Sequence, residues 1–280
     1  MANSILTNNS STVALQNLRN VNKNLSIVQE QISTGKKIGN AKDNASIFAI
    51  STVIKSDVEG FKKISDSLNL GSSTVAVARG AAEQVTSLLT QVKGLIVQAQ
   101  ESNVDRTKIQ TDVSELTNQV NSIVNAAQFN GLNLVKAATG TVNFLASLDR
   151  DSTGTVTASS ISVAAASLET TAGGGLAGLA AIDVSTAAGA ASALTAIEGL
   201  IQTAVDASAA FGSSQKRIEI QGEFVRQLTD ALTSGIGALT DADLEEASAR
   251  LQSLQVQQQL GIQALSIANQ SPQSILALFR

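Results

Sequence analysis

The chain has 280 residues and a formal net charge of −4; 43% of its residues are apolar but only 2% are aromatic, and it has no His, Cys, Trp or Tyr. The lack of Cys and His excludes disulfides, a thiolate nucleophile and the usual general base, and the negative charge gives no general attraction to nucleic acid or anionic membranes. Because Leu, Ile, Val and Ala carry the apolar content and pack well along helix seams, the composition favours a rod or helical bundle over a compact enzyme.

The first 17 residues contain neither the basic region nor the continuous apolar stretch of a cleavable signal peptide. No segment reaches the roughly 18 uncharged apolar residues that we expect of a membrane-spanning helix. These features indicate either a cytoplasmic protein or one that leaves the cell through a dedicated export apparatus.

Apolar residues then recur at alternating steps of three and four, which is the pattern of a coiled-coil seam. The seam ends before Gly35, where we expect the C-cap of a helix, and Asp43 and Ser46 are expected to cap the helix that follows. The seam positions are Leu18, Val21, Leu25, Val28 and Ile32.

A second seam keeps its register from Ile47 to Ala99 and is interrupted only at Asp57 and Gly71. One helix of that length would extend roughly 80 Å at about 1.5 Å per residue. Average globular helices have about three turns, so this seam predicts a rod. A third, shorter seam follows from Ile109 to Ile123.

Residues 131–190 are rich in Gly, Ser, Thr and Ala, and short alternating stretches at 155–157 and 161–163 predict weak strands and turns. Helical spacing resumes at Leu194. From Leu251 to Phe279 there is no charged residue but there are eight Gln. Since a solvated helix normally carries charges on its outer face, this segment predicts burial on several sides among copies of the chain.

Weakly charged seams at both ends of the chain are also compatible with a simple helical hairpin within one molecule. The uncharged C-terminal segment favours a polymer, because a lone hairpin would leave much of that surface wet. The acidic residues Asp241, Asp243, Glu245 and Glu246 lack the ligand spacing of an EF-hand loop and are typical of a helix start. We therefore expect no catalytic residue, no metal site and no cofactor.

Four segments resemble motifs of bacterial flagellins, in regions that together span roughly 1–135 and 190–280. The segments STGKKIGNAKDNAS (33–46) and QFNG (128–131) resemble motifs of the N-terminal half, and FGSSQKRIE (211–219) and 241–280 resemble the returning helix and the C-terminal signature. The whole is similar to short alphaproteobacterial, Caulobacter-type flagellins. The matching positions include Gly35, Asn40, Lys42, Asp43, Phe129, Asn130, Gly131, Gln215, Arg217 and Arg280.

The resemblance implies a mainly α fold, in which both termini build a long antiparallel helical bundle and coiled coil with a small β-rich tip. It implies an inner-core coiled coil from 1–44 and 238–280, and an outer domain made of helices in 45–130, a variable β-rich segment 131–190 and a returning helix 191–237. The inner-core positions expected to support polymerisation are Leu15, Leu18, Val21, Leu25, Val28, Ile32, Leu251, Leu254, Leu260, Leu265, Leu276 and Phe279.

The implied function is that of a non-enzymatic subunit that polymerises into the flagellar filament of a swimming cell. The implied partners are further copies of the chain, sister flagellins, hook-associated junction and cap proteins and a flagellar export chaperone, with no nucleic acid and no membrane. The implied location is extracellular, in the filament, after type III export. The alternatives are a hook–filament junction protein, a secreted coiled-coil tether or adhesin and, more remotely, a carbohydrate- or metal-dependent enzyme.

Residues 89–98 resemble the helix through which a Toll-like receptor detects many flagellins. Leu95 and Asp112 match the receptor-binding pattern, whereas Gln91 replaces a basic residue and Gly94 an acidic one. Because the guanidinium fork of an arginine is a typical interface anchor, its loss predicts weak or absent receptor activation.

The terminal seams span only a few heptads, and helices that short are marginal alone in water. We therefore expect both termini to be unfolded in the monomer and helical only after assembly; a preformed hairpin is the alternative. Pro272 is expected to break the last helix. Beyond the break, Ile275, Leu276, Leu278 and Phe279 would form an apolar plug for neighbouring subunits.

Overall fold

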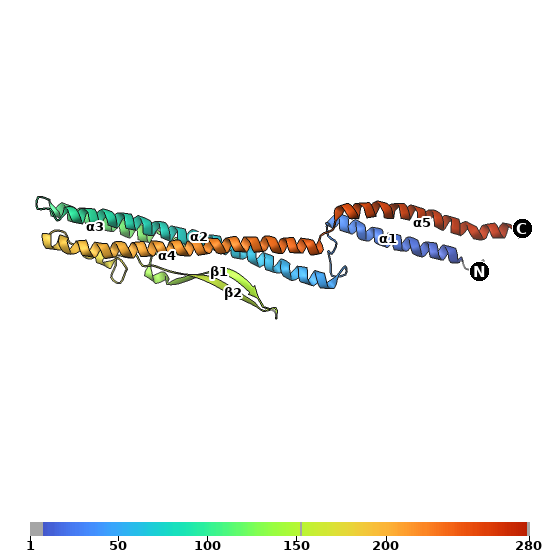
Figure 1. Cartoon of the computed structure of the whole chain (residues 1–280), viewed down its shortest axis with the longest axis horizontal. Helices are drawn as coiled ribbons and strands as arrows, with labels where there is room; N and C mark the ends of the chain where they lie inside the picture. Colours follow the sequence, from blue (N-terminus) through green and yellow to red (C-terminus); the bar gives the residue numbers. More distant parts are fainter. Residues whose placement is uncertain (1–7, 152, 279–280) are drawn as a thin grey trace. The chain divides into compact units, whose positions relative to one another are not determined.

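The computed structural model describes the backbone of residues 8–151 and 153–278, with side chains as far as residue 270 (Figure 1). Helices dominate the described residues, and they are α1 (Asn9–Thr34), α2 (Ala45–Gln98), α3 (Arg106–Ala126), α4 (Ala187–Thr240) and α5 (Leu244–Leu278). The strands β1 (Thr141–Arg150) and β2 (Val156–Ala164) form one antiparallel sheet, and short 3-10 helices occupy Ala137–Thr139 and Ala177–Ala181. The mainly α fold with a small sheet is confirmed.

The chain divides into two compact units. Unit 1 contains the described residues up to Ser56 and from Ala231 onward, and unit 2 is Asp57–Asp230. The long helices α2 and α4 each contribute residues to both units. The finer boundaries expected at 44/45, 130/131, 190/191 and 237/238 remain predictions.

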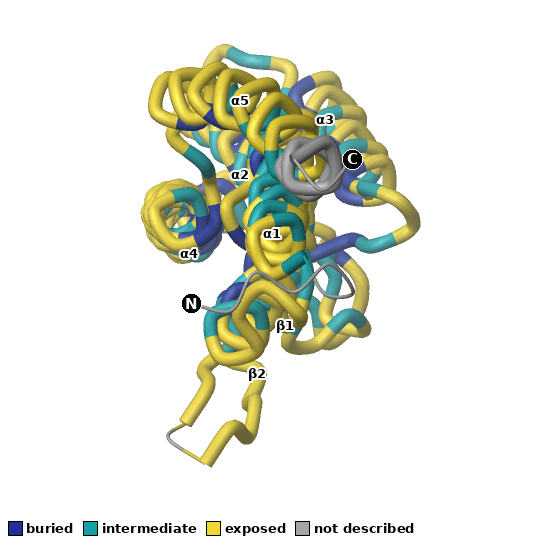
Figure 2. The backbone as a smooth tube through the Cα atoms, turned by 90° about the vertical axis from the view of Figure 1, so that its right-hand side faces the viewer, coloured by how far each residue is buried: buried dark blue, intermediate teal, exposed yellow. Residues whose placement is uncertain are grey.

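The core of unit 2 follows the long seam of α2, which is a single helix of 54 residues as predicted. Every seam position from Phe61 to Ala99 is buried, including Gly71. Figure 2 shows the helices coloured by burial, with buried and exposed residues along the same tubes. The aliphatic side chains on this stripe pack among other buried residues because unit 2 supplies matching apolar faces on its other helices. Those faces consist of Ile109, Val113, Val120 and Val124 on α3 and of Ile197, Ala204, Phe211, Ile218 and Val225 on α4.

The helix α4 also corrects two expectations. It begins at Ala187, seven residues before the helical spacing that we recognised at Leu194. It contains a window that is apolar enough, by length and composition, to cross a membrane, whereas we had identified no such segment. Ile197, Ala204 and Phe211 of this helix are buried inside unit 2, but only 28% of the apolar window is buried.

The sheet packs on α2 at the two positions that interrupt the seam. The Arg150 guanidinium of β1 donates through Nε and Nη2 to the two carboxylate oxygens of Asp57. Gly71 lies under the Phe144 ring, so close that a Cβ added to the glycine would lie 2.8 Å from two ring carbons. The apparent breaks in the helical pattern are therefore contact points for the hairpin, as is Gly60, where an added Cβ would lie 2.8 Å from the Leu148 Cδ1 atom.

This packing predicts opposite effects of the same substitution at two glycines of α2. Gly71→Ala should destabilise unit 2 by about 1–3 kcal/mol, as overpacked core methyl groups do. Gly80→Ala is the matched control, because nothing lies within 4 Å of a Cβ there. It should stabilise the helix by about 0.5–1 kcal/mol. Urea denaturation measures both values, and equal gains at the two glycines would contradict the proposed contact with Phe144.

The caps of the helices agree only in part with the sequence predictions. Gly35 ends α1 in the left-handed conformation (φ 69°), as expected. The N-cap of α2 is Asn44, not Asp43 or Ser46, because the Asn44 Oδ1 atom accepts hydrogen bonds from the backbone N–H groups of Ser46 and Ile47, at 3.1 Å each. The Asp43 carboxylate instead accepts from the N–H groups of Gly39 and Asn40 and closes the preceding turn.

Pro272 does not break the last helix, because α5 continues through it to Leu278. The expected apolar plug lies where side chains are not described, or in the case of Phe279 outside the described residues.

Candidate assembly surface

The two terminal helices, α1 and α5, pair along the seams predicted from the sequence (Figure 1). The half-buried and buried positions of α5 repeat in steps of four and three, as in a heptad. Leu18 reaches Gly261, where an added Cβ would lie 3.2 Å from the leucine Cδ1. The remaining apolar contacts join Val21, Leu25, Val28 and Ile32 with Ala247, Leu251 and Leu254.

Polar contacts continue the pairing beyond the apolar cluster. Gln258 of α5 donates a hydrogen bond to the Asn22 Oδ1 atom of α1 at 2.7 Å. Ser11 donates to the Asn269 Oδ1 atom, also at 2.7 Å. Leu265 is half-buried at the heptad position between Gly261 and Ala268. Neutral polar side chains thus form hydrogen bonds across the pair.

The outward faces of the same two helices are apolar and exposed. On α5, the side chains of Ile262 and Ile267 are 55% and 69% exposed, in a segment that carries no charge. Two predicted polymerisation residues, Leu15 and Leu260, lie on these outward faces and not in the seam. We call the exposed apolar residues of these two helices the terminal surface. They are Val13, Leu15 and Ile27 on α1 and Val256, Leu260, Ile262 and Ile267 on α5.

A compact turn joins the terminal helices to the end of α4 within unit 1. The N–H groups of Lys37 and Ile38 both donate to the Thr240 carbonyl, at 2.7 and 3.2 Å, and Ala242 donates to the Gly35 carbonyl at 3.0 Å. Asn40 stabilises the turn by accepting a hydrogen bond from the backbone N–H of Lys42. The matched segment 33–46 is therefore a connection with defined hydrogen bonds between the helices.

The acidic cluster at the start of α5 acts as a helix cap. The Asp243 Oδ1 atom accepts from the N–H groups of Glu245 and Glu246, at 3.0 and 3.1 Å. These acidic side chains also lie in the first turn, where the helix dipole favours negative charge. Among the described residues, no group of three or more Asp, Glu, His or Cys side chains is placed to hold a metal ion.

The other matched motifs in the described part of the chain also have structural explanations. In 128–131, Asn130 and Gly131 have φ values of 50° and 81°, and Phe129 and Leu132 exchange backbone hydrogen bonds across them. Asn-Gly with two positive φ angles is typical of a type I′ turn. Gln215 accepts from the Arg79 Nε atom at 3.0 Å and so joins α4 to α2, whereas Arg217 is exposed. Arg280 lies outside the described residues.

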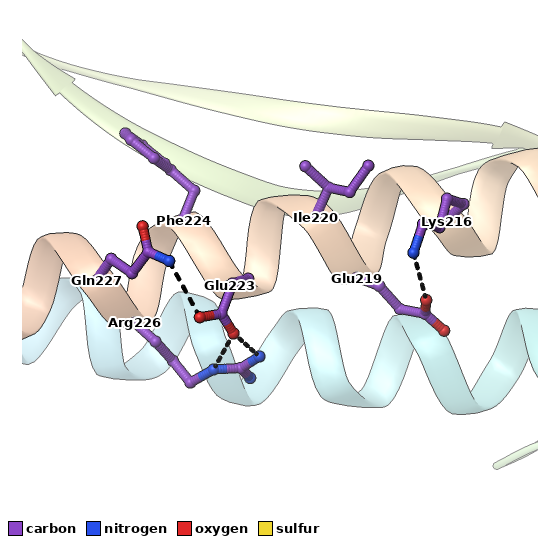
Figure 3. Close-up of a pocket in the computed structure, with 7 residues that line it drawn as sticks. All are labelled: Lys216, Glu219, Ile220, Glu223, Phe224, Arg226 and Gln227. Atoms are coloured by element: carbon purple, nitrogen blue, oxygen red, sulfur yellow. Dashed lines mark hydrogen bonds and ion pairs between the residues drawn. The ribbon is translucent and has the colours of Figure 1, made fainter.

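A second exposed apolar surface lies on α4 in unit 2. Ile220 and Phe224, one turn apart, are both more than half exposed and project from the same side of the helix (Figure 3). Charged side chains flank them, and the Arg226 guanidinium donates to the Glu223 carboxylate at 2.7 Å. This hydrogen bond lowers the pKa of Glu223.

The residues of the receptor-like pattern are exposed or half-buried, whereas Leu89, Val92 and Ile96 of the same segment are buried. Gln91 and Gly94 are exposed on α2, Leu95 is half-buried, and Asp112 is exposed on α3. Receptor recognition by these residues remains a prediction.

Comparison with known proteins identifies the family. Residues 5–141 match the bacterial flagellin N-terminal helical region, and residues 194–279 match the bacterial flagellin C-terminal helical region. The chain is 40% identical to flagellin FljM of Caulobacter vibrioides, 36% identical to flagellin C of Rhizobium meliloti and 38% identical to a flagellin of Brucella melitensis. Each alignment covers 99% of both proteins. Since the matches include both terminal helices and extend over the variable segment between them, the chain belongs to the bacterial flagellin family.

Proposed function

We propose that this flagellin polymerises through the terminal surface, the outward apolar faces of α1 and α5. As a flagellin, the chain is a non-enzymatic structural subunit of the bacterial flagellar filament. The observation that carries the proposal is the exposure of Val256, Leu260, Ile262 and Ile267 on a helix without charges after Arg250.

The energetics favour burial of this surface between copies. In the described core of the α1–α5 pair, three residues (Val28, Ala247 and Leu254) are buried, and the four that pack against them (Val21, Leu25, Ile32 and Leu251) are only partly buried. The apolar stabilisation of the isolated pair is therefore incomplete. Burying one Val, Leu or Ile side chain stabilises by about 1.5–3 kcal/mol. Neighbouring copies could therefore supply the stabilisation that the isolated pair lacks. In the single chain the two helices are formed and paired, as in the hairpin alternative, and ordering of the termini on assembly remains a prediction.

The arrangement also favours an open polymer over a closed dimer. The exposed apolar residues lie on two different helices, so we infer that those of α1 in one copy contact those of α5 in the next. Such heterologous contacts repeat without closing unless the rotation forms a ring. The exposed Ile220 and Phe224 of unit 2 offer a further contact between copies.

The terminal surface also bears on the further binding partners of the chain and on its location. An exposed apolar helix pair is an aggregation liability in a free subunit. We propose that an export chaperone covers it before type III export to the cell exterior, and that hook-associated junction and cap proteins contact it at the filament ends. Sister flagellins would share the lattice.

Electron microscopy of material assembled from the purified chain tests the proposed function. Uniform helical filaments are the expected product. Soluble dimers at concentrations well above those that other flagellins need would instead support the coiled-coil tether and contradict the proposal.

The receptor-like segment gives a separate prediction. The chain should activate the Toll-like receptor weakly, and the double substitution Gln91→Arg with Gly94→Glu should increase activation in a reporter-cell assay because it restores charged anchors. The matched control places the same charges at the exposed Gly80 and Gln84 of α2, as Gly80→Glu with Gln84→Arg, and should change nothing. Full potency of the parent chain would contradict the prediction.

A further inference from the structure

The side chain of Asn8 contacts both terminal helices. Its Oδ1 atom accepts a hydrogen bond from the backbone N–H of Ser11 at 3.0 Å and thereby caps the N-terminus of α1. Its Nδ2 atom donates to the backbone carbonyl of Ala268 in α5 at 2.7 Å. The oxygen of this carboxamide therefore caps α1, and its nitrogen binds α5.

The carbonyl of Ala268 is a special position in α5. In an α-helix it would accept the N–H of the residue four positions later. That residue is Pro272, which has no N–H, so the helix cannot supply this donor itself. A proline in a helix interior usually kinks or ends the helix, yet α5 continues to Leu278.

We propose that Asn8 is a positioning residue for polymerisation, because its carboxamide supplies the N–H that Pro272 lacks and so keeps the last turns of α5 in line with the rest of the helix. The contact also fixes the register of α1 against α5 at the far end of their pairing, where Ser11 and Asn269 add a second hydrogen bond. The inference rests on the proposed assembly role of the terminal helices. It assigns to the N-terminal end of α1 control over the conformation of the C-terminus.

The substitution Asn8→Ser separates the two hydrogen bonds. Serine is as good an N-cap as asparagine, so α1 keeps its cap. The serine hydroxyl is shorter than the carboxamide and does not reach the Ala268 carbonyl, which is then left without a donor. Because the half-buried Ala268 carbonyl loses its donor, we expect the critical concentration for filament assembly to rise on the order of tenfold.

The decisive variant is Asn8→Ser combined with Pro272→Ala. Alanine restores an N–H at position 272, so the Ala268 carbonyl no longer needs Asn8. The double variant should therefore assemble at the same critical concentration as Pro272→Ala alone. Hydrogen–deuterium exchange in filaments should show faster exchange over 269–278 in Asn8→Ser and parent-like exchange in the double variant.

The substitution Ser11→Ala is the matched control. It removes the neighbouring hydrogen bond between the helices without affecting the Ala268 carbonyl, so its effect should be the same with proline or alanine at position 272. If Asn8→Ser has no effect, or has the same effect in the Pro272→Ala background, the inference is overturned. Failure of Pro272→Ala to assemble would also overturn it, because a continuous helix accepts alanine there. The terminal-surface proposal is tested separately by the variant Ile262→Asp, whose normal assembly would contradict it.

Discussion

A chain carrying Ile262→Asp is expected to remain monomeric under conditions in which the parent chain forms filaments. Ile262 is 55% exposed on the terminal surface, and the segment from Leu251 to Phe279 has no charge that could pair with a new carboxylate. Burying an unpaired carboxylate between copies costs several kcal/mol, which exceeds the gain from burying the isoleucine. Sedimentation of assembled material measures the loss.

Two controls separate burial of the terminal surface from a general effect of charge. Ile262→Val keeps the surface apolar and should assemble. Ser248→Asp adds the same charge on α5 where Glu245, Glu246 and Arg250 already make the helix polar, and it should also assemble. Filaments of Ile262→Asp with the parent critical concentration would show that this face of α5 stays in contact with water.

Deletion of 266–280 should abolish polymerisation and leave unit 2 folded. The deletion removes Ile267 from the terminal surface, Ala268 and Asn269 from the contacts with α1, and the uncharged end of α5. None of these residues belongs to unit 2, which is Asp57–Asp230 with its own buried seam. Sedimentation should find no filaments, and circular dichroism should find a thermal transition of unit 2 close to that of the parent chain. A lost transition would mean that unit 2 needs the C-terminus to fold.

The long-range periodic features of the fold were predictable from the sequence. The seams of α1 and α2 repeat over many turns, and this repeat alone identifies which face of each helix is buried. The C-cap at Gly35 was equally predictable, because a left-handed residue after a seam is a local requirement. The family motifs identified the function for the same reason, since they occupy the connector and the turns that the fold needs.

The features that depend on distant partners were not predictable. In the sequence, Asp57 and Gly71 are only interruptions of a seam. Their partners, Arg150 and Phe144, lie far along the chain and are known only from the structure. Pro272 was expected to end a helix because local rules contain no donor for the Ala268 carbonyl, and that donor is Asn8, 260 residues earlier than Ala268. Asn44 was missed as a cap because Asp43 beside it is equally suited to the role by residue type.

Limited proteolysis of monomer and filament tests most directly whether the terminal surface is buried and ordered by assembly. Trypsin has sites at Arg19 and Lys23 in α1 and at Arg250 in α5, all exposed in the single chain. The account predicts rapid cleavage at these sites in the monomer, protection of the same sites in the filament, and survival of unit 2 in both. Equal protection of both termini in monomer and filament would contradict it and would support a preformed helical hairpin.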